Sequence, residues 1–342
     1  MSNREKFLLA LLLTVPCLMS LTPPIEAQDA SKKLLVAYAG LISTHTSVWV
    51  AEDQGLFKKH GLDVASVYTG SGSVTSQALV AGEAKLASTS VGPTAGAVGA
   101  GADLVILAGL IHILPYQFWV HSQVRQPADL KGKRVAISTF GSGAHVAAEV
   151  ALQNLGLDPV RDKIAIIQVG QQPERVAALL SGRIDAAPLD PGFAQAAKDK
   201  GLTLMLDMTK ADIPYLNTVI VASRRYVKEN PQLLESFLKG VVDGLAFLSN
   251  PSNEKAVKSV LAQRLKLSTP QSIQTMYDST LSIYAKTKVP YATVDGVQNM
   301  IDALYRVNPR MAKLKAADVV DNSFIERLEK SGYISEAMKR SR

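Results

Sequence analysis

The chain has 342 residues, 47% of them hydrophobic and 20% charged, and a formal net charge of +7 at pH 7. This composition is typical of a globular protein, the length allows two lobes, and together they exclude a largely disordered chain. Because lysines and arginines are spread along the whole chain instead of forming a basic stripe, the sequence gives no support to nucleic-acid binding.

The first predicted segment is a cleavable secretory signal. Arg4 and Lys6 precede an apolar run at residues 7–15, which is too short for a membrane-spanning helix of about 20 residues. We expect cleavage after Ala27 and export to the periplasm. The single cysteine, Cys17, lies inside this segment. We interpret it as an apolar residue of the signal; the alternative is a lipid-modified cysteine that anchors the protein.

The residues that remain after cleavage exclude several kinds of site. A mature chain without a thiol cannot form a disulfide, a cysteine-liganded zinc site or a cysteine nucleophile. The five histidines form no HxxH or HExxH pair. We therefore expect no metal and no cofactor.

Beyond the signal, strands alternate with helices in two rounds, and only helices follow. The first round predicts strands at 33–38, 62–68, 86–89 and 103–108 and helices at 48–56 and 74–81. The second predicts strands at 134–138, 164–169, 185–188 and 203–206 and helices at 144–155 and 174–180. The last part predicts helices at 232–248, 253–264, 270–284, 294–305 and 322–330. Such alternation indicates parallel sheets covered by helices.

The two rounds are related by an internal repeat. Residues 78–87 align with residues 178–187 at a constant offset, and both copies are typical of a helix, a glycine at its C-terminus and a strand. Solenoid repeats have periods of about 20–50 residues, much shorter than this one. The repeat therefore predicts two duplicated lobes.

Five sequence blocks carry a family resemblance. They are WVAEDQGLFKKHGLDV at 49–64, GSGS at 70–73, ALVAGE at 78–83, DLKGKRVA at 129–136 and GRIDAA at 182–187. In this order, and with their flanking elements over residues 33–248, they resemble the sulfonate/nitrate/taurine (SsuA/TauA-like) periplasmic binding proteins of ABC importers. One departure is Lys85, where the family pattern usually has an aspartate like Asp185 of the second copy.

The resemblance implies an α/β fold, the type II periplasmic-binding fold, with two lobes around a ligand cleft. The expected parts are the signal at 1–27, the first part of lobe I at 28–113, lobe II at 114–219, and a return crossing with C-terminal helices that complete lobe I at 220–342. The implied function is capture of a small solute without catalysis, by a monomer that delivers it to the transmembrane subunits of an ABC permease with a cytoplasmic ATPase. The alternative is an enzyme similar to the thiamine-pyrimidine synthases, which share the fold.

Candidate ligand-binding residues follow the strands, because ligands of open α/β sheets sit beyond the carboxyl ends of the strands. They are Gly40, Ser43, Thr44, His45, Gly72, Ser73, Thr89, Ser90, Tyr116, Thr139, Phe140, Ser142 and Asp190. Hydroxyls and backbone N–H groups at helix N-termini suit a sulfonate, phosphate, nitrate or carboxylate group. We therefore expect an anionic or zwitterionic ligand.

Three of these residues keep alternative interpretations. His45 is either a hydrogen-bond donor to the ligand or a solvent-facing loop residue. Asp190 either accepts a hydrogen bond from a ligand amine or caps the following turn; a carboxylate that faced an anion would repel it. Tyr116 lies near the expected first crossing between the lobes, where it either contacts the ligand or packs in the core.

Overall fold

The structure is a computed structural model that describes residues 33–198, 200–210, 214–305 and 308–340. These residues belong to one compact unit that begins at Lys33. The predicted signal at 1–27, with Cys17 and the expected cleavage after Ala27, lies outside the described residues. Within the described ranges, no helix is both long enough and apolar enough to cross a bilayer.

The first sheet is mixed and has five strands. Its order is β2 (Val64–Tyr68), β1 (Leu34–Tyr38), β3 (Leu86–Ser90), β10 (Thr218–Ser223) and β4 (Leu104–Gly109). Strand β1 pairs in parallel with β2 and β3, whereas β10 is antiparallel to both β3 and β4. We call the part of the molecule built on this sheet lobe I.

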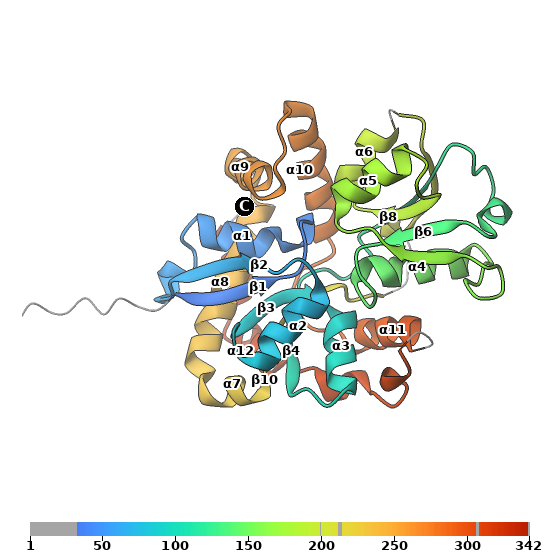
Figure 1. Cartoon of the computed structure of the whole chain (residues 1–342). Coiled ribbons are helices and arrows are strands. Elements are labelled where there is room, and N and C mark those ends of the chain that lie inside the picture. Colours follow the sequence, from blue (N-terminus) through green and yellow to red (C-terminus); the bar gives the residue numbers. More distant parts are fainter. Residues whose placement is uncertain (1–32, 199, 211–213, 306–307, 341–342) are drawn as a thin grey trace, which may run out of the picture. The chain divides into compact units, whose positions relative to one another are not determined.

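The second sheet repeats this arrangement. Its order is β7 (Ala165–Gln168), β6 (Arg134–Ile137), β8 (Ala186–Leu189), β5 (Gln117–Val120) and β9 (Thr203–Asp207). Strand β6 is parallel to β7 and β8, and β5 is antiparallel to β8 and β9. We call the part built on this sheet lobe II. In each sheet the antiparallel strand is the one that the chain forms just after it arrives from the other sheet. Figure 1 shows the two sheets, with β1, β3, β4 and β10 in lobe I and β6 and β8 in lobe II.

Helices cover both sheets. The helices of the two repeated rounds are α1 (Thr46–Asp53), α2 (Gly72–Ala81), α3 (Val91–Gly99), α4 (Gly143–Asn154), α5 (Gln172–Leu180) and α6 (Pro191–Lys198). The C-terminal helices are α7 (Arg224–Glu229), α8 (Pro231–Ser249), α9 (Glu254–Leu265), α10 (Pro270–Tyr284), α11 (Val294–Leu304), α12 (Ser323–Lys330) and α13 (Tyr333–Arg340). The predicted α/β architecture with two lobes and a helical C-terminal region is confirmed.

The repeated blocks form equivalent structures at the end of α2 and of α5. Gly82 has a φ of +75° and Gly182 a φ of +69°, the left-handed conformation that favours glycine. At the departure from the family pattern, the Lys85 ammonium donates to the carbonyl oxygen of Gly82 at 2.9 Å. At the matching position of lobe II, the Asp185 carboxylate instead accepts from the backbone N–H of Arg134 at 3.0 Å.

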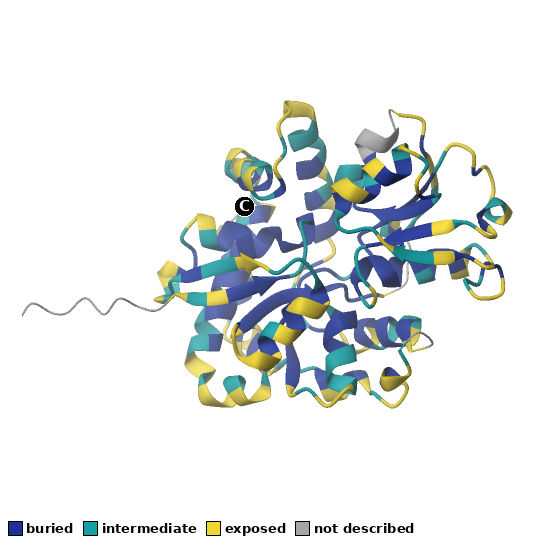
Figure 2. Ribbon diagram, viewed as in Figure 1, coloured by how far each residue is buried: buried dark blue, intermediate teal, exposed yellow. Residues whose placement is uncertain are grey.

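The C-terminal helices pack mainly on lobe I, where α8 contacts α1 and α12 contacts β4, but two of them also reach lobe II. Helix α10 packs against α6, and α11 packs against both α3 and α4. Strand β4 is buried along its full length, and Figure 2 shows the buried strands beneath helices whose outer faces are exposed.

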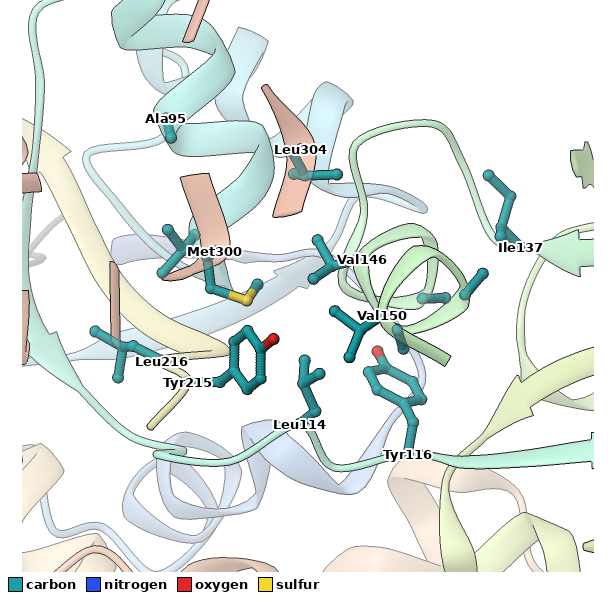
Figure 3. Packing of buried hydrophobic residues seen from close by; sticks show 14 of the residues in the cluster. Ala95, Leu114, Tyr116, Ile137, Val146, Val150, Tyr215, Leu216, Met300 and Leu304 are labelled. Carbon is teal, nitrogen blue, oxygen red and sulfur yellow. The ribbon is translucent and has the colours of Figure 1, made fainter. Parts of the chain in front are cut away.

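The hydrophobic core is continuous through the connection between the lobes. In Figure 3, Leu114 and Tyr116 of the first crossing lie in one cluster with Val146 and Val150 of α4 and with Met300 of α11. Because this cluster draws on both lobes and on a C-terminal helix, it supports the loops that surround the space between the two sheets.

Candidate functional site

A cavity of about 60 Å³ lies between the lobes. Its walls are loops that follow strands and the first turns of helices, as expected for an open α/β sheet. The lining residues from lobe I are Ala39, Gly40, Ile42, Thr44, His45, Ser71, Gly72 and Ser90, and those from lobe II are Ser138, Ser142, Gly143, Ala144, Gln171, Gln172 and Arg175. Tyr116, Asn217 and Thr218, at the two crossings between the sheets, complete the wall.

Five helices of the described chain begin at this cavity, because the N-cap residues of α1, α2, α3, α4 and α5 all line it. Two of them are capped by serines, since Ser71 Oγ accepts from the N–H of Val74 at 3.3 Å and Ser142 Oγ accepts from the N–H of His145 at 3.2 Å. The first-turn N–H groups of a helix have no partner within the helix and carry the positive end of its dipole. Their convergence from both lobes favours a negatively charged ligand group.

A buried cation lines the same cavity. Arg175, in the first turns of α5, is only 2% exposed. Its Nη1 donates to the carbonyl oxygen of Gly170 at 2.6 Å, whereas its Nε has no hydrogen-bond partner among the described residues. Burial lowers the pKa of the guanidinium to about 10, which leaves it charged at neutral pH. No carboxylate of the described chain forms an ion pair with it.

A second unpaired donor comes from the return crossing. The backbone of Asn217 is fixed by hydrogen bonds to Ile111 and from Val91, and its Oδ1 accepts from Thr218 Oγ1 at 3.1 Å. Its Nδ2 has no partner in the part of the chain that the structure describes, although the residue is 2% exposed. Buried donors are normally satisfied, so Asn217 offers a hydrogen bond to a bound molecule.

Gly143, the first residue of α4, makes room for two polar groups. A Cβ atom at this position would lie 2.9 Å from Asn217 Nδ2 and 3.1 Å from Tyr116 Oη. Any side chain at Gly143 would therefore displace the amide or the hydroxyl. Burial raises the pKa of the Tyr116 phenol to about 12, so the hydroxyl keeps its proton at neutral pH.

Seven of the residues predicted from the sequence line the cavity: Gly40, Thr44, His45, Gly72, Ser90, Tyr116 and Ser142. His45 is 3% exposed, and its Nδ1 lies 2.8 Å from Ser88 Oγ, so it is not a solvent-facing loop residue. Burial lowers the pKa of His45 to about 3. The imidazole is therefore neutral at physiological pH and adds no charge to the cavity.

The other six predicted residues do not line it. Ser43 Oγ donates to Asp190 Oδ2 at 2.6 Å, and Asp190 Oδ1 accepts from the N–H of Gly192 at 2.8 Å, so the carboxylate is held at the start of α6. Burial raises the pKa of Asp190. The cap of α2 is Ser71 and not Ser73, which is exposed.

Thr89, Thr139 and Phe140 lie outside the cavity lining for different reasons. The Oγ1 atoms of Thr89 and Thr139 are buried without a partner among the described residues, but neither residue is part of the wall. Phe140 is 52% exposed, and its ring packs edge-on against the imidazole of His145 with centroids 5.2 Å apart. It therefore covers the loop before α4 from outside.

The sequence analysis missed the charged and amide groups of the wall. Gln171, Gln172, Arg175 and Asn217 were not among the candidates, because only hydroxyls, glycines and a few aromatic or titratable residues after strands were considered. A usable signal was present for Arg175. The helix predicted at 174–180 follows a strand of the repeat, so its first turn had to lie at the same sheet edge as the serine loops.

Comparison with solved structures places the fold. The alkanesulfonate-binding protein SsuA from Xanthomonas axonopodis pv. citri, bound to MOPS, is similar with a TM-score of 0.70 at 22% identity, over 85% of this chain and 98% of that one. The periplasmic nitrate-binding protein NrtA from Synechocystis PCC 6803 gives a TM-score of 0.75 at 15% identity, over 90% of each chain. At these identities the likeness establishes the fold alone.

Sequence comparison identifies the family. A chain from Brachyspira hyodysenteriae, named as an ABC transporter periplasmic binding protein, is 29% identical over 99 residues, which span 29% of this chain and only 28% of that relative. The profile of the NMT1/THI5-like family matches residues 42–254, more than half of the chain. The chain therefore belongs to the NMT1/THI5-like family and has the fold of the periplasmic binding proteins.

Proposed function

We propose that the chain is the extracytoplasmic solute-binding component of an ABC importer, which captures a small anionic organic solute by lobe closure. The observation that carries this proposal is the buried Arg175, whose Nε lacks a partner among the described residues at a cavity shared by both lobes. The periplasmic binding protein fold and the ABC transporter relative support the assignment.

Closure of the lobes would assemble the site, because its walls come from both of them. Thr44, Gly72 and Ser90 belong to lobe I, whereas Ser142 and Arg175 belong to lobe II. A ligand that contacts both walls stabilises the closed state by the contacts it makes only there.

The lobes also touch each other directly. Gln171 of lobe II donates from Nε2 to the carbonyl oxygen of Gly70 of lobe I at 2.7 Å. A Cβ at Gly92 of α3 would lie 2.4 Å from the carbonyl oxygen of Gly141 before α4. These contacts surround the cavity, so a closed site shields the ligand from water and strengthens its electrostatic interactions.

An anionic ligand group would supply the counter-charge and the hydrogen-bond acceptors that the cavity wall lacks. A buried guanidinium without a counter-charge is costly, and an anionic ligand group removes that cost. Unpaired donors on Arg175 and Asn217 require acceptors, and the helix N-termini favour negative charge. Sulfonate and carboxylate groups provide charge and several acceptor oxygens together.

The contacts also favour capture over catalysis. Ser43, His45 and Asp190 are a serine, a histidine and an aspartate that lie near one another, but they do not form a catalytic triad. Ser43 donates to Asp190, whereas the His45 ring bonds to Ser88. With its pKa lowered to about 3, His45 is a weak proton acceptor and a poor general base near neutral pH. We therefore propose that the bound solute is released unchanged. The alternative, an enzyme similar to the thiamine-pyrimidine synthases, predicts its conversion.

The remaining parts of the proposal follow from the importer role. The chain would act as a monomer in the periplasm, after removal of the signal at residues 1–27, and would present both closed lobes to the transmembrane subunits of a permease driven by a cytoplasmic ATPase. N-terminal sequencing of the secreted protein tests the export step. A lipid-modified product that begins at Cys17 would contradict it.

Calorimetry and scattering test solute capture. Short alkanoates, alkanesulfonates and nitrate are titrated into the wild type, Arg175→Gln and, as a control, Arg183→Gln, whose side chain is exposed in the same lobe. We expect a binder that reduces the radius of gyration of the wild type and is recovered unchanged by mass spectrometry. Arg175→Gln should weaken its binding at least about 10-fold, whereas Arg183→Gln should not. Binding without compaction, or conversion of the compound, would contradict the proposal.

A further inference from the structure

We infer that the cleft selects monoanions that carry no ammonium group and rejects zwitterions such as amino acids and aminosulfonates. This inference rests on the proposed function and narrows its ligand class. It is carried by the charges around the cavity, where a buried cation and unpaired donors come together without any acidic side chain in the wall.

Among the residues that the structure describes, the cavity lining contains no carboxylate. Its described residues are apolar or glycine, hydroxyl, amide, one phenol, one imidazole and one guanidinium. His45 is neutral and Tyr116 keeps its proton, so Arg175 is the only charged side chain of the wall at neutral pH. A ligand ammonium inside the cavity would therefore face a like charge and no counter-charge.

The acidic residues nearest to the wall are already engaged or turned to solvent. Asp190 is fully buried, and its two oxygens accept from Ser43 Oγ at 2.6 Å and from the N–H of Gly192 at 2.8 Å. Ser279 Oγ lies 3.5 Å from Oδ1. Glu174, next to Arg175 in sequence, is exposed and does not line the cavity. The charges of Asp190 and Glu174 act on the wall residues Tyr116 and Arg175, but neither carboxylate is part of the described wall that a bound ammonium would face.

The unpaired groups of the wall are donors. Arg175 Nε and Asn217 Nδ2 each lack an acceptor among the described residues, and both side chains are 2% exposed. An ammonium also has only hydrogens to donate and no acceptor to offer. The anionic end of a zwitterion can satisfy these two donors, but its ammonium would lose hydration and gain no counter-charge from the described wall.

Isosteric ligand pairs test this selection. Propionate is compared with glycine, and propane-1-sulfonate with taurine, because the members of each pair have equal numbers of non-hydrogen atoms and differ in the ammonium. Nitrate, propionamide and ethylammonium complete the panel as a simple anion, a neutral compound and a cation. Calorimetry at pH 7 on the full mature chain should show the monoanion of at least one pair binding about 100-fold or more tightly than its zwitterion.

A charge-introducing variant gives a second readout. Asn217→Asp is nearly isosteric and places a carboxylate in the wall. We expect it to weaken the monoanion and to shift the monoanion-to-zwitterion affinity ratio at least about 10-fold toward the zwitterion. The control, Gln77→Glu, adds the same charge on the exposed face of α2 outside the cavity and should leave the ratio unchanged. Thermal unfolding of both variants confirms that they fold.

The outcomes separate this inference from the proposed function. Equal or tighter binding of the zwitterions, or binding of propionamide or ethylammonium but of no anion, would overturn the inference and leave solute capture standing. If Asn217→Asp folds and does not change the ratio, the wall charge does not control selection and the inference fails. If the wild type binds no compound of any class, solute capture itself is contradicted.

Discussion

The hydrogen bond between Ser43 and Asp190 joins the lobes beside the cavity and not inside it. We expect Ser43→Ala to weaken ligand binding although Ser43 does not line the cavity. Ser43 Oγ of lobe I donates to Asp190 Oδ2 of lobe II at 2.6 Å, and Asp190 is fully buried. Removing one partner of a buried hydrogen bond leaves the other unsatisfied and costs about 1–3 kcal/mol. In an open state, water takes the place of Ser43 as the partner of Asp190. The Ser43→Ala substitution therefore destabilises only the closed state.

Ligand affinity should therefore fall about 5- to 150-fold in Ser43→Ala, because the proposed bound state requires the closed lobes. Calorimetry measures the affinity, and small-angle scattering at saturating ligand shows whether the closed state is still reached. Ser73→Ala is the matched control, since Ser73 is exposed at the start of α2 and lies outside the cavity. A change of less than about threefold in Ser43→Ala, which lies below the expected range, would refute the reasoning.

Four further predictions concern the pH dependence of affinity, the pH dependence of stability, the ligand size and the distance between the lobes. Because burial lowers the pKa of His45 to about 3 and that of Arg175 only to about 10, neither of these two wall groups should change its charge between about pH 5 and 9. Affinity for an alkanesulfonate, which stays ionised over this range, should therefore show no midpoint near the ordinary histidine value of about 6.5, and such a midpoint would contradict this. The same lowered His45 pKa means that the unfolded chain binds the proton first, so the free energy of unfolding measured by denaturant titration should fall as the pH drops from about 6.5 toward 3. A buried water needs about 10–15 Å³, so a cavity of about 60 Å³ holds about four to six non-hydrogen atoms. Affinity in a series from acetate to octanoate should therefore decline beyond that size. A continuous rise in affinity to octanoate would show that the cavity widens. Gly92→Ala places a Cβ 2.4 Å from the carbonyl oxygen of Gly141, so it should keep the lobes apart and leave the radius of gyration unchanged on ligand addition; full compaction would contradict the contact.

The fold could be predicted from the sequence because it rests on local, repeated signals. Alternating strand and helix patterns, with a glycine at the end of α2 and after α5, gave the α/β lobes and their duplication. Strands β5 and β10 were missed as strands because each follows a crossing between the lobes. Their pairing partners, β8 and β9 for β5 and β3 and β4 for β10, are set by tertiary structure and not by neighbours in sequence.

Other elements were missed because their local signals are weak. Helix α3 has the sequence VGPTAGAVG, in which glycine and proline lower the helix propensity, and it is formed by packing against α2 and α11. The short helices α6, α7 and α13 likewise follow other elements closely, where a periodic pattern has too few residues to stand out. Tertiary contacts decide these segments.

The residues of the candidate site that lie at helix N-termini could be predicted from the sequence, whereas its charged and amide residues could not. Serines and glycines after strands have a local reason to be there, which the sequence shows, and Ser142 and Gly72 do line the cavity. Arg175 and Asn217 are recognisable as site residues only because the fold leaves part of their hydrogen-bonding capacity unused. Each is buried, and each keeps a donor without a partner among the described residues, which no residue pattern reveals. Asp190 is the opposite case. Its side chain lies near the site, but its oxygens accept hydrogen bonds from Ser43 and from the backbone at the start of α6. The charge of the cavity wall thus depends on which charged groups lack a partner when the lobes are in contact. Those partners are set by contacts between residues more than 100 positions apart in sequence.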